Sequence, residues 1–142
     1  MEVIVSGKDI CKYIPQRDPI VMIDKFYGIE GNTSTTGLTV KADCILCANG
    51  RLTDGGVIEH IAQSGAMYIG YEAISKGERV PLGFIGSINK MTINRLPKAG
   101  EELLTTIVME AKVGDISLVS ATVQSAGETI ATGKMKVATK PQ

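Results

Sequence analysis

The stretch DGGVIEHIAQSGAMYIGYEAISK, residues 54–76, decides the fold because it has the period of a long helix. Its apolar side chains recur every three or four positions, so they line one face of a helix. Thr53 or Asp54 can cap its start, and Gly77 suits the position at which a helix ends. The sequence therefore predicts a helix over 54–76 whose core-facing residues are Val57, Ile58, Ile61, Ala62, Ala66, Ile69 and Ala73.

The opposite side of this helix carries unusually small residues. Gly65 and Gly70 lie where a solvated helix would usually carry Lys or Glu. Glycine lowers helix stability by about 1 kcal/mol relative to alanine, so we expect other backbone to pack closely around the helix.

The remainder of the chain reads mainly as strands rich in Ile, Val and Thr. Four of them follow the helix through short turns, over residues 82–96, 101–113, 116–125 and 128–140. The last three of these form an antiparallel meander. Ahead of the helix we expect a short helix over 6–15 and two paired strands over 20–30 and 36–44. One long helix followed by a long-stranded antiparallel sheet predicts an α+β fold in which the sheet wraps the helix. The edge strand of such a sheet has unpaired backbone N–H and C=O groups, and many proteins pair them with the edge strand of a second subunit in a dimer.

The bulk composition favours one soluble domain over residues 1–142. With 15 basic and 15 acidic residues the formal net charge is zero, which argues against nucleic acid or an anionic membrane as the main partner. No signal peptide opens the chain and no apolar run approaches a membrane span, so we expect a cytoplasmic protein.

The three cysteines are Cys11, Cys44 and Cys47, and this odd number does not indicate a disulfide framework. The CILC spacing of residues 44–47 can form half of a zinc site or a redox pair. A zinc site needs two more ligands, so we interpret these cysteines as small buried hydrophobes and expect no metal and no nucleotide.

Three segments, in this order, resemble the 3-hydroxyacyl-acyl-carrier-protein dehydratases. YIPQRDPIVMIDKF (13–26) is similar to the family's opening motif, Leu-Pro-His-Arg-x-Pro followed by an apolar stretch that ends in Asp. GGVIEHIAQSGA (55–66) is similar to its central helix, and FIGSINKMTINRLPKAGEEL (84–103) to the strand and turn that follow. The resemblance implies the hotdog fold, a long helix wrapped by an antiparallel sheet and normally dimeric.

The resemblance also implies a site for 3-hydroxyacyl thioesters carried on the phosphopantetheine of an acyl-carrier protein or of coenzyme A, with no other cofactor. In that family a histidine of one protomer and a helix carboxylate of the other act as base and acid, and a backbone N–H at the helix start polarises the thioester carbonyl. The carboxylate corresponds to Glu59 and the N–H to Gly56. Gln63 is placed to hydrogen-bond the carboxylate, and Gly86 is implied to contact substrate.

The family's His-Phe-Pro-Gly motif is missing, and Ile45 stands where its histidine should be. In this respect the chain is most similar to the divergent dehydratase-like proteins of aryl-polyene biosynthesis. His60 is the one histidine in the sequence and the remaining candidate for a catalytic imidazole. Adjacent helical residues point about 100° apart, so Glu59 and His60 cannot aim at one point from the same helix. The alternative for His60 is a helix-surface residue that caps a carbonyl or lines an interface.

Glu59 also has two interpretations. A carboxylate in the first turns of a helix is stabilised by the helix dipole without any chemistry. Its apolar neighbours, however, disfavour the charged form, which suits a general acid or base.

Three functions remain open from the sequence. The first is dehydration of 3-hydroxyacyl thioesters in fatty-acid or polyene-type biosynthesis, by a homodimer or by a heterodimer with a related hotdog subunit. The second is a hotdog acyl thioesterase, which can act with a single carboxylate. The third is a catalytically inactive subunit, or acyl-binding partner, of an intact dehydratase.

Overall fold

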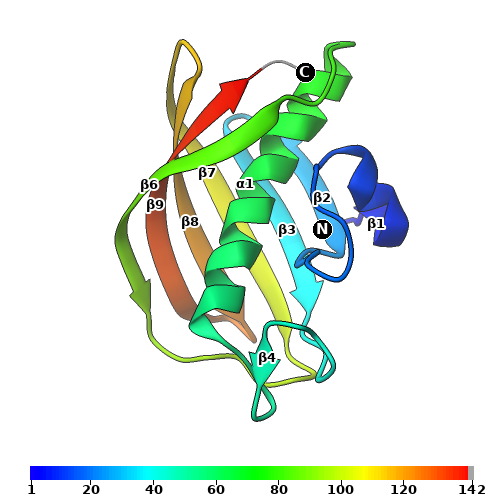
Figure 1. Ribbon diagram of the computed structural model, residues 1–142, viewed down its shortest axis with the longest axis vertical. Helices are drawn as coiled ribbons and strands as arrows, with labels where there is room; N and C mark the ends of the chain where they lie inside the picture. The colour runs from blue at the N-terminus through cyan, green and yellow to red at the C-terminus, as the bar shows by residue number, and fades with distance from the viewer. Residues whose placement is uncertain (141–142) are drawn as a thin grey trace.

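The computed structural model describes residues 1–140, except the side chain of Phe84, so the last two residues of the expected domain lie outside the description. One long helix, α1 (Asp54–Ser75), lies against a seven-stranded antiparallel sheet (Figure 1). The strands follow the order β1-β2-β3-β7-β8-β9-β6. Their bounds are Val5–Ser6 for β1, Lys25–Glu30 for β2, Thr33–Thr39 for β3, Leu82–Ile93 for β6, Glu102–Val113 for β7, Ile116–Ser125 for β8 and Glu128–Lys140 for β9. The α+β arrangement expected from the sequence is confirmed.

Helix α1 begins and ends as its sequence predicts. The Thr53 hydroxyl accepts a hydrogen bond from the Gly56 N–H, which makes Thr53 the N-cap. Gly77 follows the last turn with a φ of 74°, a left-handed conformation that glycine adopts without strain. The small residues also serve close packing, because a Cβ at Gly70 would overlap the Tyr13 carbonyl oxygen.

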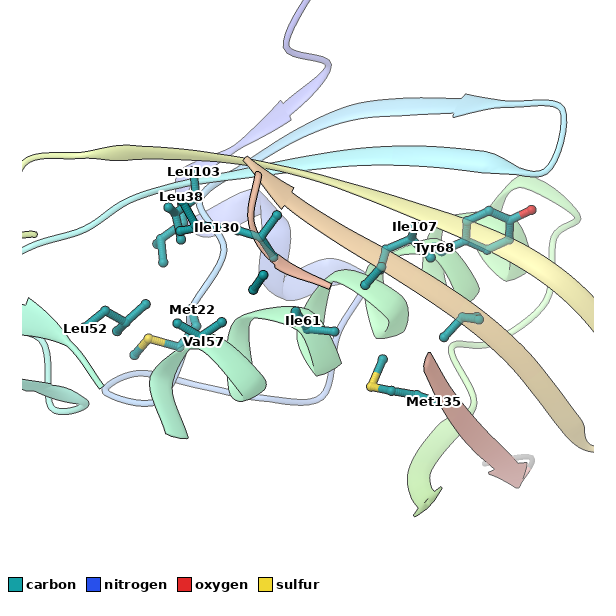
Figure 2. Packing of buried hydrophobic residues seen from close by; sticks show 14 of the residues in the cluster. Met22, Leu38, Leu52, Val57, Ile61, Tyr68, Leu103, Ile107, Ile130 and Met135 are labelled. Carbon is teal, nitrogen blue, oxygen red and sulfur yellow. The ribbon is translucent and has the colours of Figure 1, made fainter. Parts of the chain in front are cut away.

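The main hydrophobic core fills the space between α1 and the sheet. Figure 2 shows Val57, Ile61 and Tyr68 of the helix among side chains of the strands, including Ile107 and Met135. A second cluster lies beside the helix and joins Met67 to the N-terminal segment, with Ile10, Ile14, Ile23 and Phe26. The helix is therefore packed on two of its sides, by the sheet and by the N-terminal segment.

The short helix expected over 6–15 is present as the 3-10 helix η1 (Gly7–Lys12), with Ser6 at its N-cap. The expectation of a strand over 20–30 is wrong for its first part, because the strand begins only at Lys25. The physical reason lies in α1, whose Gln63 side chain accepts a hydrogen bond from the Met22 N–H at 2.6 Å and donates one to the Ile20 carbonyl at 2.8 Å. These backbone groups are bound by a helix side chain and do not enter the sheet ladder.

A polar cluster fixes the turn between β6 and β7. Arg95 donates two hydrogen bonds to the Glu101 carboxylate at 2.9 and 3.0 Å, and Ser125 of β8 donates a third at 2.7 Å. The Arg95 guanidinium, with the Lys98 N–H and the Ser125 hydroxyl, lowers the pKa of Glu101 to about 2. The turn that contains the Pro-x-x-Gly-Glu pattern is thus held by structural interactions.

Candidate functional site

Glu59 lies on the face of α1 that the sheet and the N-terminal segment cover least. Its neighbours on that face, Ile58, Ala62, Ala66 and Ile69, are also partly exposed, whereas the opposite face is buried. Within residues 1–140 Glu59 makes no hydrogen bond or ion pair. The structure therefore places a carboxylate without a partner among apolar side chains on an open helix face.

Gly56 lies at the start of the same helix and is packed tightly. A Cβ at this position would overlap the Leu52 side chain and come within 3.2 Å of Leu46. The Gly56 N–H, which the resemblance assigns to the thioester carbonyl, already donates to the Thr53 hydroxyl at 3.2 Å. A substrate carbonyl would have to share or displace this capping bond.

The loop that lacks the catalytic histidine is attached to the helix start. The Leu46 carbonyl accepts hydrogen bonds from both the N–H and the hydroxyl of Thr53, at 2.9 and 2.7 Å. Ile45, at the position of the missing imidazole, is 59 % exposed. The loop is therefore held next to the helix start, but its side chain at 45 cannot transfer a proton.

His60 is fully buried inside its own chain, so the alternative of a helix-surface histidine is wrong. Its Nδ1 lies 2.7 Å from the Met22 carbonyl oxygen, which can only accept, so Nδ1 carries the proton. Its Nε2 then accepts the Thr105 hydroxyl proton at 2.6 Å. Burial lowers the pKa of His60 to about 4, against the opposing effects of the Met22 carbonyl and of Asp24. The ring is neutral near pH 7, and both nitrogens are occupied.

Gln63 does not hydrogen-bond Glu59 in this structure, which differs from the expectation. Its amide binds the backbone of Ile20 and Met22, and His60 binds Met22 from the preceding helical turn. Together the two side chains clamp the 20–22 segment against α1. Neither the clamp nor the Thr105 contact has a short-range sequence signal, because the partners lie about forty positions apart.

Gly86 lies away from the helix residues, in the outermost strand β6. It sits in a break of the β6–β9 register between Ile85 and Ser87. A Cβ here would meet only ordinary contacts, the nearest being the Lys136 carbonyl oxygen at 3.6 Å. The chain's own packing does not require glycine at this position, and a contact with substrate stays a prediction.

The cysteines are free and only partly buried, and Cys44 and Cys47 pack against the main core as small hydrophobic side chains. The Cys44 thiol lies 3.5 Å from the Met22 sulfur, and that of Cys47 lies 3.2 Å from the Lys41 carbonyl oxygen. Burial and the neighbouring Cys44 raise the pKa of Cys47 to about 11, so the Cys47 side chain is a thiol at neutral pH. Among residues 1–140, no group of three or more His, Cys, Asp or Glu side chains is placed to hold a metal ion.

Glu59 lines neither of two sizeable cavities. One, of about 460 Å³, lies beside Ile45 between the N-terminal segment and the loop after β3. The other, of about 550 Å³, lies at the C-terminal half of α1. The described part of the chain contains no helix long and apolar enough to cross a membrane.

The model of the ApeP-like family, described as ApeP dehydratase, matches residues 8–142, almost the whole chain. The chain belongs to the ApeP-like family. This ApeP-like chain is also similar to the dehydratase heterocomplex ApeI:P from Xenorhabdus doucetiae, with a TM-score of 0.85 and 18 % identity over 94 % of this chain and 91 % of that one. No curated protein matches it.

More distant structures confirm the hotdog fold of this ApeP-like chain. An uncharacterised protein, PH1136 from Pyrococcus horikoshii, has a TM-score of 0.68 and 12 % identity over 95 % of this chain and 94 % of that one. The E. coli PaaI protein from the phenylacetic acid degradation operon has a TM-score of 0.64 and 14 % identity over 80 % of each chain. At these identities the likeness concerns the fold alone.

Proposed function

We propose that this ApeP-like chain is one subunit of a dimeric hotdog dehydratase that removes water from 3-hydroxyacyl thioesters. The acyl group is carried by an acyl-carrier protein or coenzyme A, and Glu59 acts in proton transfer. The observation that carries the proposal is the position of Glu59, partly buried on the open apolar face of α1 and without a partner within residues 1–140. A carboxylate that no other group of its own chain engages is available to a bound substrate as a general acid or base.

The reaction needs two groups. A base removes a proton from C2 of the acyl chain, and an acid protonates the C3 hydroxyl, which leaves as water while the C2–C3 double bond forms. Glu59 in its carboxylic acid form supplies the proton to the hydroxyl. The base takes the C2 proton, and transfer of this proton back to Glu59 restores the starting state.

The base has to come from another subunit. Ile45 has no titratable group, and His60 is buried with both ring nitrogens occupied. We infer that a second hotdog subunit brings the imidazole to Glu59. This arrangement is supported by the similarity of the chain to a dehydratase heterocomplex.

The outer edge of β6 is the place we assign to this partner. β6 ends the sheet, has 12 residues and pairs only with β9 among the described strands. Three large apolar side chains along it are exposed: Leu82, Ile85 and Ile88. A long apolar edge of this kind invites pairing with another strand, which favours a dimer.

The experiment follows enoyl formation from 3-hydroxyacyl thioesters by the purified chain, alone and with any hotdog subunit that co-purifies with it. Replacing the proton-transfer group, Glu59→Gln, is expected to lower kcat by roughly 10²–10⁴-fold with unchanged stability. Glu110→Gln, on the outer face of the sheet, is the matched control and should retain full turnover. Full turnover in Glu59→Gln would contradict the proposal.

A second candidate function is thioester hydrolysis, favoured by the single carboxylate with no imidazole available in its own chain. One carboxylate can activate water or attack the thioester directly. Release of free thiol without an enoyl product would identify it. If Glu59→Gln leaves the partner's activity unchanged and the chain has no activity alone, the chain is an inactive or acyl-binding subunit.

A further inference from the structure

The larger cavity, at the C-terminal half of α1, has an apolar floor and a charged rim. Its volume is about 550 Å³, and its floor includes Ile69, Ala73 and Met109. The rim carries three basic and three acidic side chains, all of them exposed except the half-buried Glu72.

The floor of this cavity continues the helix face on which Glu59 lies. The face runs through positions 59, 62, 66, 69 and 73, which are spaced three or four residues apart and so lie above one another. Glu59 and Ile69 are ten residues apart, which is roughly 15 Å along a helix. A ligand extended along this face from Glu59 therefore reaches the cavity.

The charges on the rim balance, which argues against an anionic ligand for this cavity. Lys76, Arg79 and Lys112 are matched in number by Glu72, Glu78 and Asp115, so the rim has no net formal charge. Lys76 is also engaged by Glu72, at 3.9 Å. A phosphate would meet as many carboxylates as cations, which leaves the apolar floor as the recognising surface.

We propose that this cavity receives the far end of a long acyl chain whose thioester end lies at Glu59. The inference rests on the proposed function, since it takes Glu59 as the reacting end. With C–C bonds of about 1.5 Å, an extended chain needs roughly twelve carbon atoms to span the distance. Shorter chains end on the open helix face, whereas chains of this length or longer bury their last methylenes against Ile69, Ala73 and Met109.

The test measures binding of inert ligands, so that it does not depend on turnover. The probes are acyl amides of aminopantetheine, in which an NH replaces the thioester sulfur, with butyryl, octanoyl, dodecanoyl and tetradecanoyl chains. Titration calorimetry on the full chain, or on its two-subunit complex, gives their Kd values. Each methylene that enters the cavity should tighten binding by about fourfold, so tetradecanoyl should bind more tightly than octanoyl, with the steepest gain between dodecanoyl and tetradecanoyl.

A matched pair of variants locates the effect. Ile69→Asn makes the floor polar, while Ile74→Asn changes an isoleucine of the same helix that is 44 % exposed and does not line the cavity. The gain beyond octanoyl should disappear in Ile69→Asn and persist in Ile74→Asn, with octanoyl binding unchanged in both. Unchanged octanoyl binding also shows that both variants are folded.

Three results would overturn the inference: tetradecanoyl binding no tighter than octanoyl, equal behaviour of the two variants, or no binding of any probe. Failure of the proposed function gives a different pattern. In that case the long-chain gain persists, but neither short nor long 3-hydroxyacyl thioesters are dehydrated.

Discussion

His60 shows how one buried polar side chain serves the structure of this protein. Its ring joins the Met22 carbonyl to the Thr105 hydroxyl and thereby ties the N-terminal segment, α1 and β7 together. The unfolded chain exposes the imidazole to water, where it binds a proton with an ordinary pKa near 6.5. The folded chain binds that proton only near pH 4, because burial disfavours the charged ring.

This difference predicts how stability depends on pH. Between about pH 6.5 and pH 4 the unfolded state binds a proton that the folded state does not, so stability falls as pH falls. The full effect is roughly 3 kcal/mol, since each pKa unit corresponds to about 1.4 kcal/mol. Urea denaturation at a series of pH values should show this loss in the wild type. His60→Gln should be less stable at pH 7 but nearly flat across the window, and parallel curves for the two proteins would disprove the assignment.

Glu101 affects the stability of the protein over a separate, more acidic pH range. Its pKa is lowered in the folded state, so its contribution is complete above about pH 4.5 and is lost as pH falls toward 2. Glu101→Gln should remove this second decline and leave the His60 decline intact. The same urea titrations, extended to lower pH, measure it, and a decline below pH 4.5 that persists in Glu101→Gln would show that other carboxylates cause it.

At the scale of the elements, two of the glycines in α1, Gly65 and Gly70, have different surroundings. A Cβ at Gly70 would overlap the Tyr13 carbonyl oxygen, whereas one at Gly65 would meet the Met135 methyl at an ordinary 3.6 Å. Gly70→Ala should therefore lower the free energy of unfolding by about 2 kcal/mol. Gly65→Ala should leave it unchanged or raise it by up to about 1 kcal/mol through helix propensity. Thermal melts compare the two, and equal shifts would mean that the backbone contact at Tyr13 yields at little cost.

The elements also show where sequence patterns are sufficient. β8 and β9 have the predicted bounds, because alternating side chains and a two-residue turn specify an antiparallel pair locally. The segment 20–24 has the same strand-like composition but is not a strand. Its backbone groups bind the side chains of His60 and Gln63, and no local pattern records a hydrogen bond across forty residues.

The candidate site likewise contains residues that the sequence identifies and contacts that it does not. Glu59 and Gly56 were recognisable from the helix motif and its family resemblance. The use of the Gly56 N–H by Thr53 and the burial of His60 depend on how loop, helix and sheet meet, which the motif does not encode.

At the scale of the whole molecule, the β6 edge of the sheet is the place that we assign to a partner. β6 exposes Ile85 at 43 % beside the register break at Gly86, so a lysine there would place a charge in the interface we assign. Ile85→Lys should weaken dimerisation, with itself or with a second hotdog subunit, by more than about tenfold. Analytical ultracentrifugation measures the change. Val113→Lys, at the 73 % exposed end of β7, is the control, and equal dimerisation of both variants would place the interface elsewhere.

The paired hydrogen bonds between Leu46 and Thr53 have a consequence for engineering. They anchor the backbone next to residue 45 independently of the side chain that residue carries. An imidazole introduced by Ile45→His would thus be attached to backbone that is already held beside the helix start, and the loop would not have to change. In a dimer of two such variant chains, the imidazole of each protomer would then supply the base for the Glu59 carboxylate of the other.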